Sequence, residues 1–468
     1  MATVPLPAVA GNPSFQDALA PFLQQPGLPF ANVLDAEAIE QAFAQRDALF
    51  AANAIFSTPI VLWAFIAQVL RDGKEAACAA AVADIATYMQ QTGRQGPSGD
   101  TGDYCRARAK LDLPALRDLV AQVARQLEEQ APPEWLWHGR HAKLVDGFTF
   151  TMPDTIDNQD AFPQLRTQEP GVGLPIARAC WVLSLATAAI CDLAVGPYEG
   201  KETGETALLR SILDRLDGGD VVVFDRYYCS YMMLALLKLR GVEACTCLHQ
   251  CRSDDFRRGR QLGAGDYLVT WTRPACPEWM SPEIYAQIPE TLTLRVLEFD
   301  VVVPGRRTET ITVVTTLTDP LAYPKEAIAQ LYGYRWNAEL DIRDIKQTLG
   351  LDHARCKTPQ MVRRELWVTL LAYNLIRKVI ATAAALHDKQ PRRIGFTLAC
   401  QTVLSSWMLL ATGTCRNVRR LTDSALARIA ANEVANRPGR IEPRVLKRRR
   451  HRYPLMIRPR KQLRKELA

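Results

Sequence analysis

Four polar side chains of different chemistry recur at helical spacing in one segment of this chain. The segment is LYGYRWNAELDIRDIKQTLGLD, and its Tyr332, Arg335, Glu339 and Lys346 stand at offsets of 0, 3, 7 and 14 residues from the tyrosine. At about 100° of rotation per residue, the four lie within roughly 60° of one another on a helix. A single carboxylate in a row with cations suits a site that holds a phosphate group and a metal ion.

The other faces of this predicted helix are interpreted differently. An apolar stripe beside the polar row is expected to pack against a core, and it consists of Leu331, Ile342, Ile345 and Leu349. Two further acids, Asp341 and Asp344, lie roughly 180° and 120° around the helix from Tyr332, outside the polar row. The alternative interpretation is an ordinary solvated face with an Arg-Glu pair.

Two further acidic residues stand in apolar, β-branched runs that predict strands. Asp146 lies inside Ala142–Met152 (AKLVDGFTFTM), and Asp225 ends Val221–Asp225 (VVVFD). A charge in such a strand is costly unless it is paired or bound to a metal. Two strand carboxylates and one helix carboxylate are the set that two-metal phosphoryl transfer needs. Alternatively, either aspartate is a plain turn or strand-end residue.

These residues together resemble a known family. The order Asp146, Asp225, Glu339 is similar to that of DDE transposases on a ribonuclease-H-like fold, and Tyr332-x2-Arg335-x3-Glu339-x6-Lys346 resembles the YREK signature of the IS4 family. Asp146-Gly147 and Asp225-Arg226-Tyr227-Tyr228 resemble that family's first two acidic motifs. The resemblance runs from about Tyr104 to the C-terminus and is loose before it.

The resemblance implies a metal-dependent reaction on DNA. Asp146, Asp225 and Glu339 would hold two Mg²⁺ or Mn²⁺ ions, which activate water to nick the transposon end and then activate the freed 3′-hydroxyl for strand transfer. The partners would be double-stranded DNA, namely the terminal inverted repeats and the target, and a second copy of the chain in a synaptic homodimer.

The same resemblance assigns DNA contacts to the other signature residues. Arg335 and Lys346 would bind phosphates beside the scissile bond, and Tyr332 would contact the backbone. Trp336 matches an aromatic residue of some members, which cut the second strand through a DNA hairpin with a base flipped from the stack. Trp336 lies about 40° around the helix from the polar row. This position allows the ring to stack on the flipped base, and it equally allows the ring to be buried in the core.

The elements that would position this site predict an α/β protein. The order β-β-β-α-β-α-β, with an aspartate on the first and fourth strands, is that of a ribonuclease-H-like core. Its strands are predicted at 142–152, 177–185, 188–195, 221–225 and 244–249, and its helices at 205–216 and 230–239. The 113 residues between Asp225 and Glu339 include alternating β-like runs, which predict a β-rich insertion. A helix over Glu365–Leu386 would close the fold.

Five regions follow along the chain: a helical N-terminal DNA-binding domain (1–135), the first part of the core (136–251), the insertion (252–318), the second part with closing helices (319–436) and a basic tail (437–468). The first region contains predicted helices over Thr58–Leu70 and Glu75–Thr92 and a cationic segment, Tyr104–Lys110. It either reads DNA ends or serves as an all-helical support.

Charge is concentrated in the tail. From Arg437 to Ala468 there are 13 Lys and Arg residues against two Glu, a net +11, so the remaining residues carry −4 of the chain's +7. The clusters Lys447–Arg452 and Arg458–Lys465 are typical of segments that bind polyanions through counterion release. A solvated tail without a specific role, or a nuclear-import signal, would have the same composition.

No signal peptide or membrane span is predicted, and the protein is expected to be cytoplasmic and nucleoid-associated, with its 12 cysteines reduced. Cys245, Cys247, His249 and Cys251 alternate along a predicted strand. They spread over roughly 20 Å of one face and so cannot close around a single Zn²⁺.

Two other classes of function remain from sequence. A non-transposing nuclease of the same fold would differ in its substrate ends and strand-transfer products. A catalytically silent, transposase-derived DNA-binding protein is disfavoured because all three carboxylates and every position of the signature are present.

Overall fold

The computed structural model describes residues 34, 36–46, 50, 55–91, 95–252, 259–301, 309–411, 417–434 and 456–466. The chain divides into two compact units. The helical unit comprises Met1–Trp135, Ala186–Asp192 and Asp341–Val434, and the sheet unit comprises Leu136–Leu185, Leu193–Leu340 and Ala435–Ala468. The closing segment after Leu340 therefore groups with the N-terminal helices.

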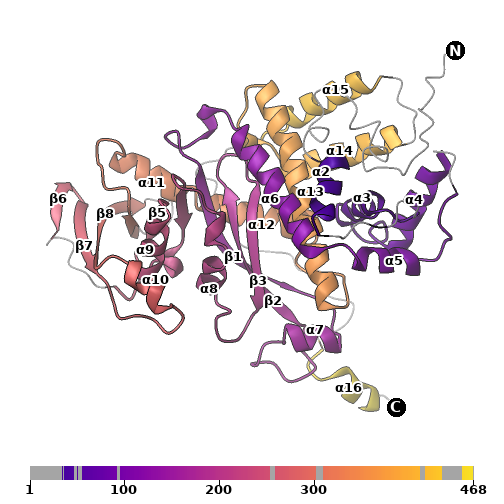
Figure 1. The fold of residues 1–468 in the computed structure, drawn as a ribbon, viewed down its shortest axis with the longest axis horizontal. Helices are drawn as coiled ribbons and strands as arrows, with labels where there is room; N and C mark the ends of the chain where they lie inside the picture. Colours follow the sequence, from indigo (N-terminus) through magenta and orange to yellow (C-terminus); the bar gives the residue numbers. More distant parts are fainter. Residues whose placement is uncertain are drawn as a thin grey trace. The chain divides into compact units, whose positions relative to one another are not determined.

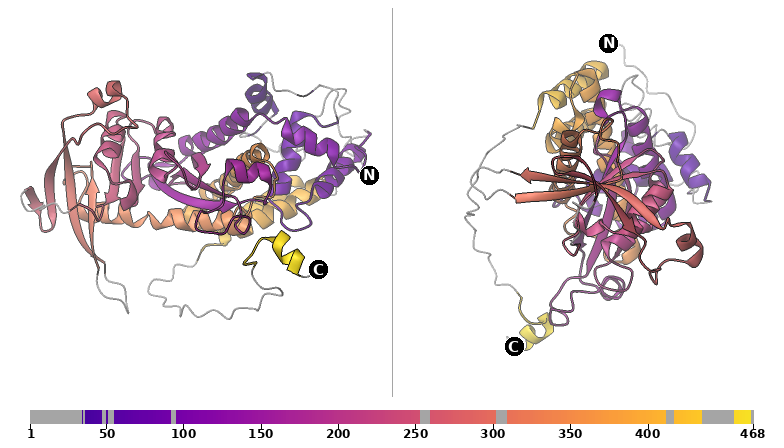
Figure 2. Two further views of the ribbon diagram at one scale, coloured as in Figure 1. Left: turned by 90° about the horizontal axis from the view of Figure 1, so that it is seen from below. Right: turned by 90° about the vertical axis from the view of Figure 1, so that its left-hand side faces the viewer.

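One nine-stranded mixed sheet organises the sheet unit (Figure 1), in the order β3-β2-β1-β4-β5-β9-β8-β7-β6. Its strands fan out in the right-hand view of Figure 2, as expected from the twist of sheets. The strands are β1 (Ala142–Thr151), β2 (Ile176–Ser184), β3 (Ile190–Pro197), β4 (Val221–Phe224), β5 (Glu243–Cys247), β6 (Arg260–Gly263), β7 (Asp266–Thr272), β8 (Thr291–Val301) and β9 (Glu309–Thr315).

The first five strands lie within two residues of their predicted bounds. β1 is antiparallel to β2 and parallel to β4, and β4 is parallel to β5. The crossover before β4 contains α8 (Glu205–Arg210) and a short 3₁₀ turn (Leu213–Arg215), where one longer helix was predicted. The next crossover contains α9 (Tyr231–Leu239), as predicted. The observed order is thus the mixed α/β order expected from sequence.

The region between Asp225 and Glu339 continues the same sheet. β9 pairs antiparallel with β5, β8 with β9, and β7 with both β8 and β6. The alternating β-like runs predicted here form β7, β8 and β9, and α10 (Pro282–Gln287) lies between β7 and β8. A buried ion pair joins the first two: Arg295 Nε and Nη2 donate to the Asp266 carboxylate at 2.8 and 2.6 Å. The β-rich character is as predicted, but these strands extend the sheet and do not form one of their own.

The helical unit is built around one long apolar helix, α13 (Pro359–Leu386), which begins six residues before the predicted start. By length and composition it could cross a membrane, but 89% of its most apolar window is buried inside the protein. It packs against α3 (Thr58–Val69), α6 (Leu113–Glu129), α14 (Phe396–Ala411) and α15 (Val418–Ala431). It is therefore a core helix of this unit.

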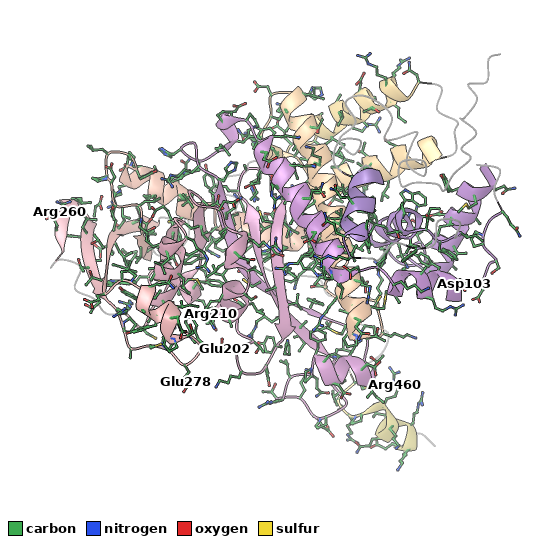
Figure 3. The ribbon with its side chains drawn as sticks, viewed as in Figure 1. Asp103, Glu202, Arg210, Arg260, Glu278 and Arg460 are labelled. Atoms are coloured by element: carbon green, nitrogen blue, oxygen red, sulfur yellow. The ribbon has the colours of Figure 1, made fainter. Side chains whose placement is uncertain are left out.

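Further short helices are α2 (Ala36–Ala44), α4 (Cys78–Gln91), α5 (Gly102–Ala109), α7 (Ile156–Ala161) and α16 (Arg460–Glu466). Helices α3 and α4 correspond to the helix pair predicted near the N-terminus. In the tail, Lys447–Arg452 lies outside the described residues, whereas Arg460, labelled in Figure 3, lies on exposed α16.

Candidate active site

Strand register brings the two aspartates together. Lys143 pairs with Val222 and Leu144 with Val223 in the parallel β1–β4 ladder. Continuing this register by two residues places Asp225, directly after β4, opposite Asp146. Neighbouring strands lie about 4.8 Å apart, so the two residues lie side by side, and the charge of Asp225 acts on Asp146.

The Asp146 side chain on β1 is largely buried. Burial is the main cause that raises the pKa of its carboxyl from 3.8 to about 6, and the nearby charges of Asp225 and Glu205 raise it further. The Gly147 N–H, which donates to Asp146 Oδ1 at 2.8 Å, and the Arg335 guanidinium act in the opposite direction. Asp146 is therefore an acid in a low-dielectric site crowded with other carboxylates.

Asp225 is fixed by its own turn. Its Oδ1 accepts the Tyr227 backbone N–H at 2.8 Å, and its carbonyl accepts the Thr246 hydroxyl of β5 at 2.9 Å. The following tyrosines diverge: Tyr227 is 51% exposed, whereas Tyr228 is fully buried.

A fourth carboxylate at this site, Glu205, is not identified by the sequence analysis. It is the first residue of α8, and its Oε2 accepts the Tyr228 hydroxyl at 3.3 Å. A Cβ added at Gly147 would lie only 2.2 to 2.5 Å from the Glu205 carboxyl atoms. Burial raises the pKa of Glu205, and Asp225 raises it further, whereas Arg178 and the Tyr228 hydrogen bond lower it. The available signal was the glycine after Asp146, which leaves room for this carboxyl group.

The predicted continuous helix through the YREK signature is wrong in one respect: it breaks between α11 (Lys325–Gly333) and α12 (Trp336–Thr348). At the break the backbone hydrogen bonds span three residues, not four. The Arg335 N–H donates to Tyr332 O at 3.0 Å, and the Ala338 N–H donates to Arg335 O at 3.0 Å. Gly333 ends α11, as its low helix propensity favours. Tyr332 and Glu339 thus lie on two helices, with Arg335 in the turn between them.

Arg335 interacts with both the helix acid Glu339 and the strand acid Asp146. Its Nη1 donates to Glu339 Oε1 at 3.2 Å, and its charge also acts on Asp146. The Glu339 side chain is 41% exposed. Trp336 is 62% exposed, with its ring 5.1 Å from the Arg335 guanidinium carbon, so of its two interpretations burial in the core is excluded.

The remaining signature residues have protein partners. Tyr332 is half-buried, and burial together with the Cys247 thiol, to which it is hydrogen bonded, raises the pKa of its phenol above the ordinary range. Lys346 Nζ lies 3.1 Å from the Asp352 carboxylate. In this structure neither side chain is fully exposed.

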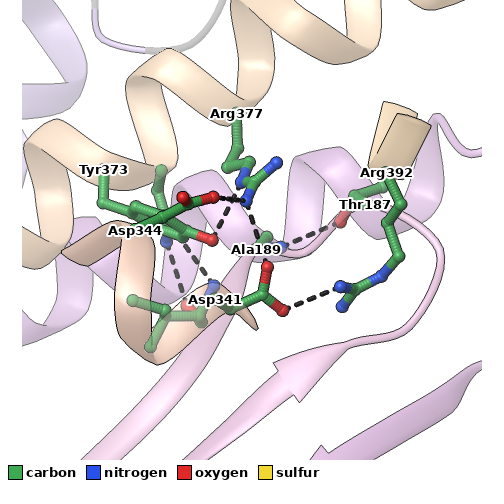
Figure 4. A network of polar contacts seen from close by, with 9 residues as sticks. Thr187, Ala189, Asp341, Asp344, Tyr373, Arg377 and Arg392 are labelled. Carbon is green, nitrogen blue, oxygen red and sulfur yellow. Dashed lines mark hydrogen bonds and ion pairs between the residues drawn. The ribbon is translucent and has the colours of Figure 1, made fainter. Parts of the chain in front are cut away.

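The two acids predicted to lie outside the polar row form a separate cluster in the helical unit (Figure 4). Asp341 is 3% exposed and accepts from Arg377 at 3.1 Å and from Arg392 at 2.7 Å. Asp344 lies 3.5 Å from Arg377, whose Nε also donates to the Tyr373 hydroxyl at 2.8 Å. Asp341 is therefore a structural acid.

The donor set of the sheet site fits a hard divalent cation. The carboxylate of Glu205 occupies the space that Gly147 leaves, and its charge and that of Asp225 both act on Asp146. Carboxylate oxygens of this kind are the ligands that such cations prefer. No three His, Cys, Asp or Glu side chains already converge as a finished metal site anywhere in the described part of the chain. Arg335 is the cation that neutralises Glu339 here. The alternating cysteines offer no such donor set: Cys245 and Cys247 are buried on β5, and Cys251 is exposed beyond it.

Comparison with known proteins gives a family match over half of the chain. The family model described as "Transposase DDE domain" matches residues 137–375. The chain is 27% identical over 356 residues to "Transposase InsG for insertion sequence element IS4" of Escherichia coli (strain K12), covering 75% of this chain and 77% of that protein.

Two weaker similarities accompany these matches. "Putative transposase InsZ" of the same organism is 25% identical over 143 residues, which is 27% of this chain and 46% of that protein. The solved structure described as "Cryo-EM structure of piggyBac transposase synaptic complex with hairpin DNA" is 9% identical, with a TM-score of 0.42 over 90% of this chain and 86% of that chain.

Proposed function

Because this chain belongs to the IS4 family of DDE transposases, which cut and join DNA with divalent metal ions, we propose that Asp146, Asp225 and Glu339 are its catalytic acids. The observation that carries the assignment is the β1–β4 register, which brings Asp225 opposite Asp146 when it is continued by two residues, together with the effect of the Asp225 charge on Asp146. Glu339 follows on α12, with Arg335 between it and Asp146.

The metal site is assigned to these three side chains, with two Mg²⁺ or Mn²⁺ ions per site. When bound, the ions would lower the pKa of the attacking water or 3′-hydroxyl and neutralise the leaving oxygen. Asp146 on β1 and Asp225 directly after β4 stand on two neighbouring strands inside the sheet, and they fix the position of the scissile phosphate. Glu339 joins them when its carboxylate leaves Arg335, and the guanidinium is then available to a DNA phosphate.

The neighbouring residues are assigned to the DNA. Arg335 and Lys346 bind backbone phosphates in place of their present carboxylate partners, Glu339 and Asp352. The Tyr332 hydroxyl, which is hydrogen bonded to the Cys247 thiol in this structure, is assigned a contact with the DNA backbone. Trp336, already exposed, is available to stack on a flipped base.

The substrate of this reaction is double-stranded DNA at two ends of one element. Cut-and-paste movement requires both terminal inverted repeats to be held together, so a homodimer is proposed for the synaptic complex. Basic residues of the tail, including those of α16, add affinity for any DNA through phosphate contacts. The place of action is the DNA of the cytoplasm, in the nucleoid.

A cleavage and joining assay on labelled transposon-end DNA tests the assignment. Asp225→Asn is expected to bind the ends and to lose Mg²⁺-dependent nicking, whereas Asp217→Asn, in the exposed turn before β4, is expected to nick normally. Wild-type protein should also join the freed 3′ ends to target DNA. Nicking without joining would identify a non-transposing nuclease, and full activity of Asp225→Asn would refute the site.

A further inference from the structure

Glu205 contributes a carboxylate that the three acids of the proposed site do not account for. It comes from a different element, α8, which packs on β2, and yet its charge acts on both Asp146 and Asp225. Two features of the sheet unit define the position of its carboxyl group. The Tyr228 hydroxyl donates to it at 3.3 Å, and the missing side chain of Gly147 leaves the space that it occupies.

The geometry around Gly147 links this acid to the metal site. The Gly147 N–H holds the Asp146 carboxylate at 2.8 Å, and its missing Cβ leaves the space that the Glu205 carboxyl occupies, 2.2 to 2.5 Å from where a Cβ would lie. One residue therefore orients the first catalytic acid and admits a second acid beside it. A side chain at position 147 would displace the Glu205 carboxyl.

Tyr228 holds Glu205 from the other side. Its ring is fully buried, and its hydroxyl lies 3.5 Å from Cys180 Sγ on β2, directly opposite Gly147 in the β1–β2 register. Tyr228 also belongs to the turn that begins at Asp225. The segment that supplies the second catalytic acid thus also supplies the support for Glu205.

Arg178 and the Tyr228 hydroxyl offset part of the charge of Glu205, and Arg335 offsets part of that of Asp146. Like charges held close together still destabilise a fold, and a bound divalent cation would offset that cost. We propose that Glu205 is a fourth acidic residue of the active site, which Gly147 and Tyr228 position so that its charge tightens the binding of divalent metal ions. The inference rests on the proposed function, because it takes the metal site of Asp146 and Asp225 as given.

Titration of the full-length chain with Mn²⁺ in the absence of DNA, followed by electron paramagnetic resonance, tests the proposal without an activity readout. Glu205→Gln keeps an oxygen that can accept the Tyr228 hydroxyl but removes the charge. It should bind Mn²⁺ about tenfold more weakly, because affinity for such cations depends on the number of ligand charges. The matched control is Glu278→Gln, at a residue labelled in Figure 3. It removes an exposed charge that is paired with Lys201, and the variant should bind Mn²⁺ as wild type does.

Thermal unfolding gives a second readout, in which Glu205→Gln should increase the stability of the metal-free protein although it weakens Mn²⁺ binding. Without metal, Glu205→Gln should melt roughly 2–4 °C higher than wild type, since repulsion with Asp146 and Asp225 is relieved. With Mn²⁺ it should gain less than wild type gains. A residue that served only as hydrogen-bond partner of Tyr228 would change neither quantity on substitution by glutamine.

Gly147→Ala probes position without removing charge. The clashing atoms are the far end of the flexible Glu205 side chain, so the fold should tolerate the change while the carboxyl moves away. Mn²⁺ affinity should fall as in Glu205→Gln, and the double variant should bind no more weakly than Glu205→Gln alone.

The outcomes separate the two claims. Wild-type Mn²⁺ affinity in Glu205→Gln, together with loss of binding in Asp146→Asn, overturns the role of Glu205 and leaves the proposed function standing. Wild-type affinity in Asp146→Asn and Asp225→Asn overturns the proposed site itself. If Glu205→Gln does not fold, Gly147→Ala decides, and unchanged affinity in that variant also overturns the role of Glu205.

Discussion

Glu339 and Asp341 stand two residues apart on α12 and have opposite surroundings. The Glu339 side chain is 41% exposed and has one cationic partner, Arg335, at 3.2 Å. The Asp341 side chain is 4% exposed and is held by Arg377 and Arg392. Two residues correspond to about 200° of helical rotation, so neighbouring acids on one helix can face solvent and core. The acid with fewer partners is the one that remains available for a ligand.

The largest expected effect tests the exposed acid. Glu339→Gln should lower the rate of Mg²⁺-dependent nicking by about a thousandfold or more. Removal of a metal-binding or charge-stabilising group from an active site has effects of this order. Binding of end DNA and the melting temperature should stay close to wild type, because only one half-exposed ion pair is lost. Residual nicking near the wild-type rate would show that Glu339 is only a surface acid.

The buried acid should show the reverse pattern. Asp341→Asn leaves two arginines without their shared carboxylate and should lower the free energy of unfolding by about 3–5 kcal/mol, measured by denaturant titration. Nicking per folded molecule should be retained. Asp344→Asn, with a longer contact to Arg377 and a 25% exposed side chain, serves as the control and should cost about 1 kcal/mol or less. If Glu339→Gln lowered the free energy of unfolding as much as Asp341→Asn does, the two acids would not differ in their structural roles.

A pH series extends the contrast to Asp146. Its pKa is raised to about 6, so the folded protein holds this proton between about pH 4 and 6 while the unfolded chain has released it. The charged form therefore costs stability above pH 6. In metal-free protein, Asp146→Asn should be more stable than wild type by about 2–3 kcal/mol above pH 6, and the difference should vanish as the pH falls towards 4.

The reverse pH dependence would mean that Asp146 is a paired structural acid like Asp341. Mn²⁺ affinity of the wild-type chain should fall as the pH drops through about 6, because the proton and the cation compete for the same carboxylate. Affinity that is flat across this range would remove Asp146 from the metal site.

The smallest effect concerns an exposed ring of the same helix. Trp336 is 62% exposed, so Trp336→Ala should leave the fold intact. Nicking should continue, whereas hairpin and double-strand products should fall about tenfold, since stacking on a base contributes about 1–3 kcal/mol. The measurement is product analysis on labelled end DNA. Lys346→Ala, assigned to a phosphate, should slow both steps, and normal hairpin yield in Trp336→Ala would end the stacking proposal.

Sequence reasoning succeeded where local pattern and topology coincide. Apolar β-branched runs identified β1 and β4, and the crossover order made them parallel neighbours, which is sufficient to bring Asp146 and Asp225 together. Helical rotation separated Glu339 from Asp341. The apolar stripe was recognised in large part: Leu331, Ile345 and Leu349 are buried, and Ile342 is half-buried.

Features that sequence periodicity does not encode were missed. The helix break at Arg335 follows from local i→i−3 bonding that periodicity cannot distinguish from a continuous helix. Glu205 lies at the predicted start of a helix that is shorter than expected, and the direction of its side chain depends on how α8 packs on β2. The burial of Asp341 depends on Arg377 and Arg392, which are 36 and 51 residues away.

The arrangement of α13 has a consequence for the order in which the chain is made. Its apolar surface is covered by α3 and α6, which emerge earlier from the ribosome, and by α14 and α15, which emerge later. Until about Ala431 has been synthesised, a segment apolar enough to resemble a membrane span is only partly sheltered. A chain truncated before α14 should therefore aggregate or be captured by chaperones, whereas a chain truncated after Val434 should complete its helical unit during translation.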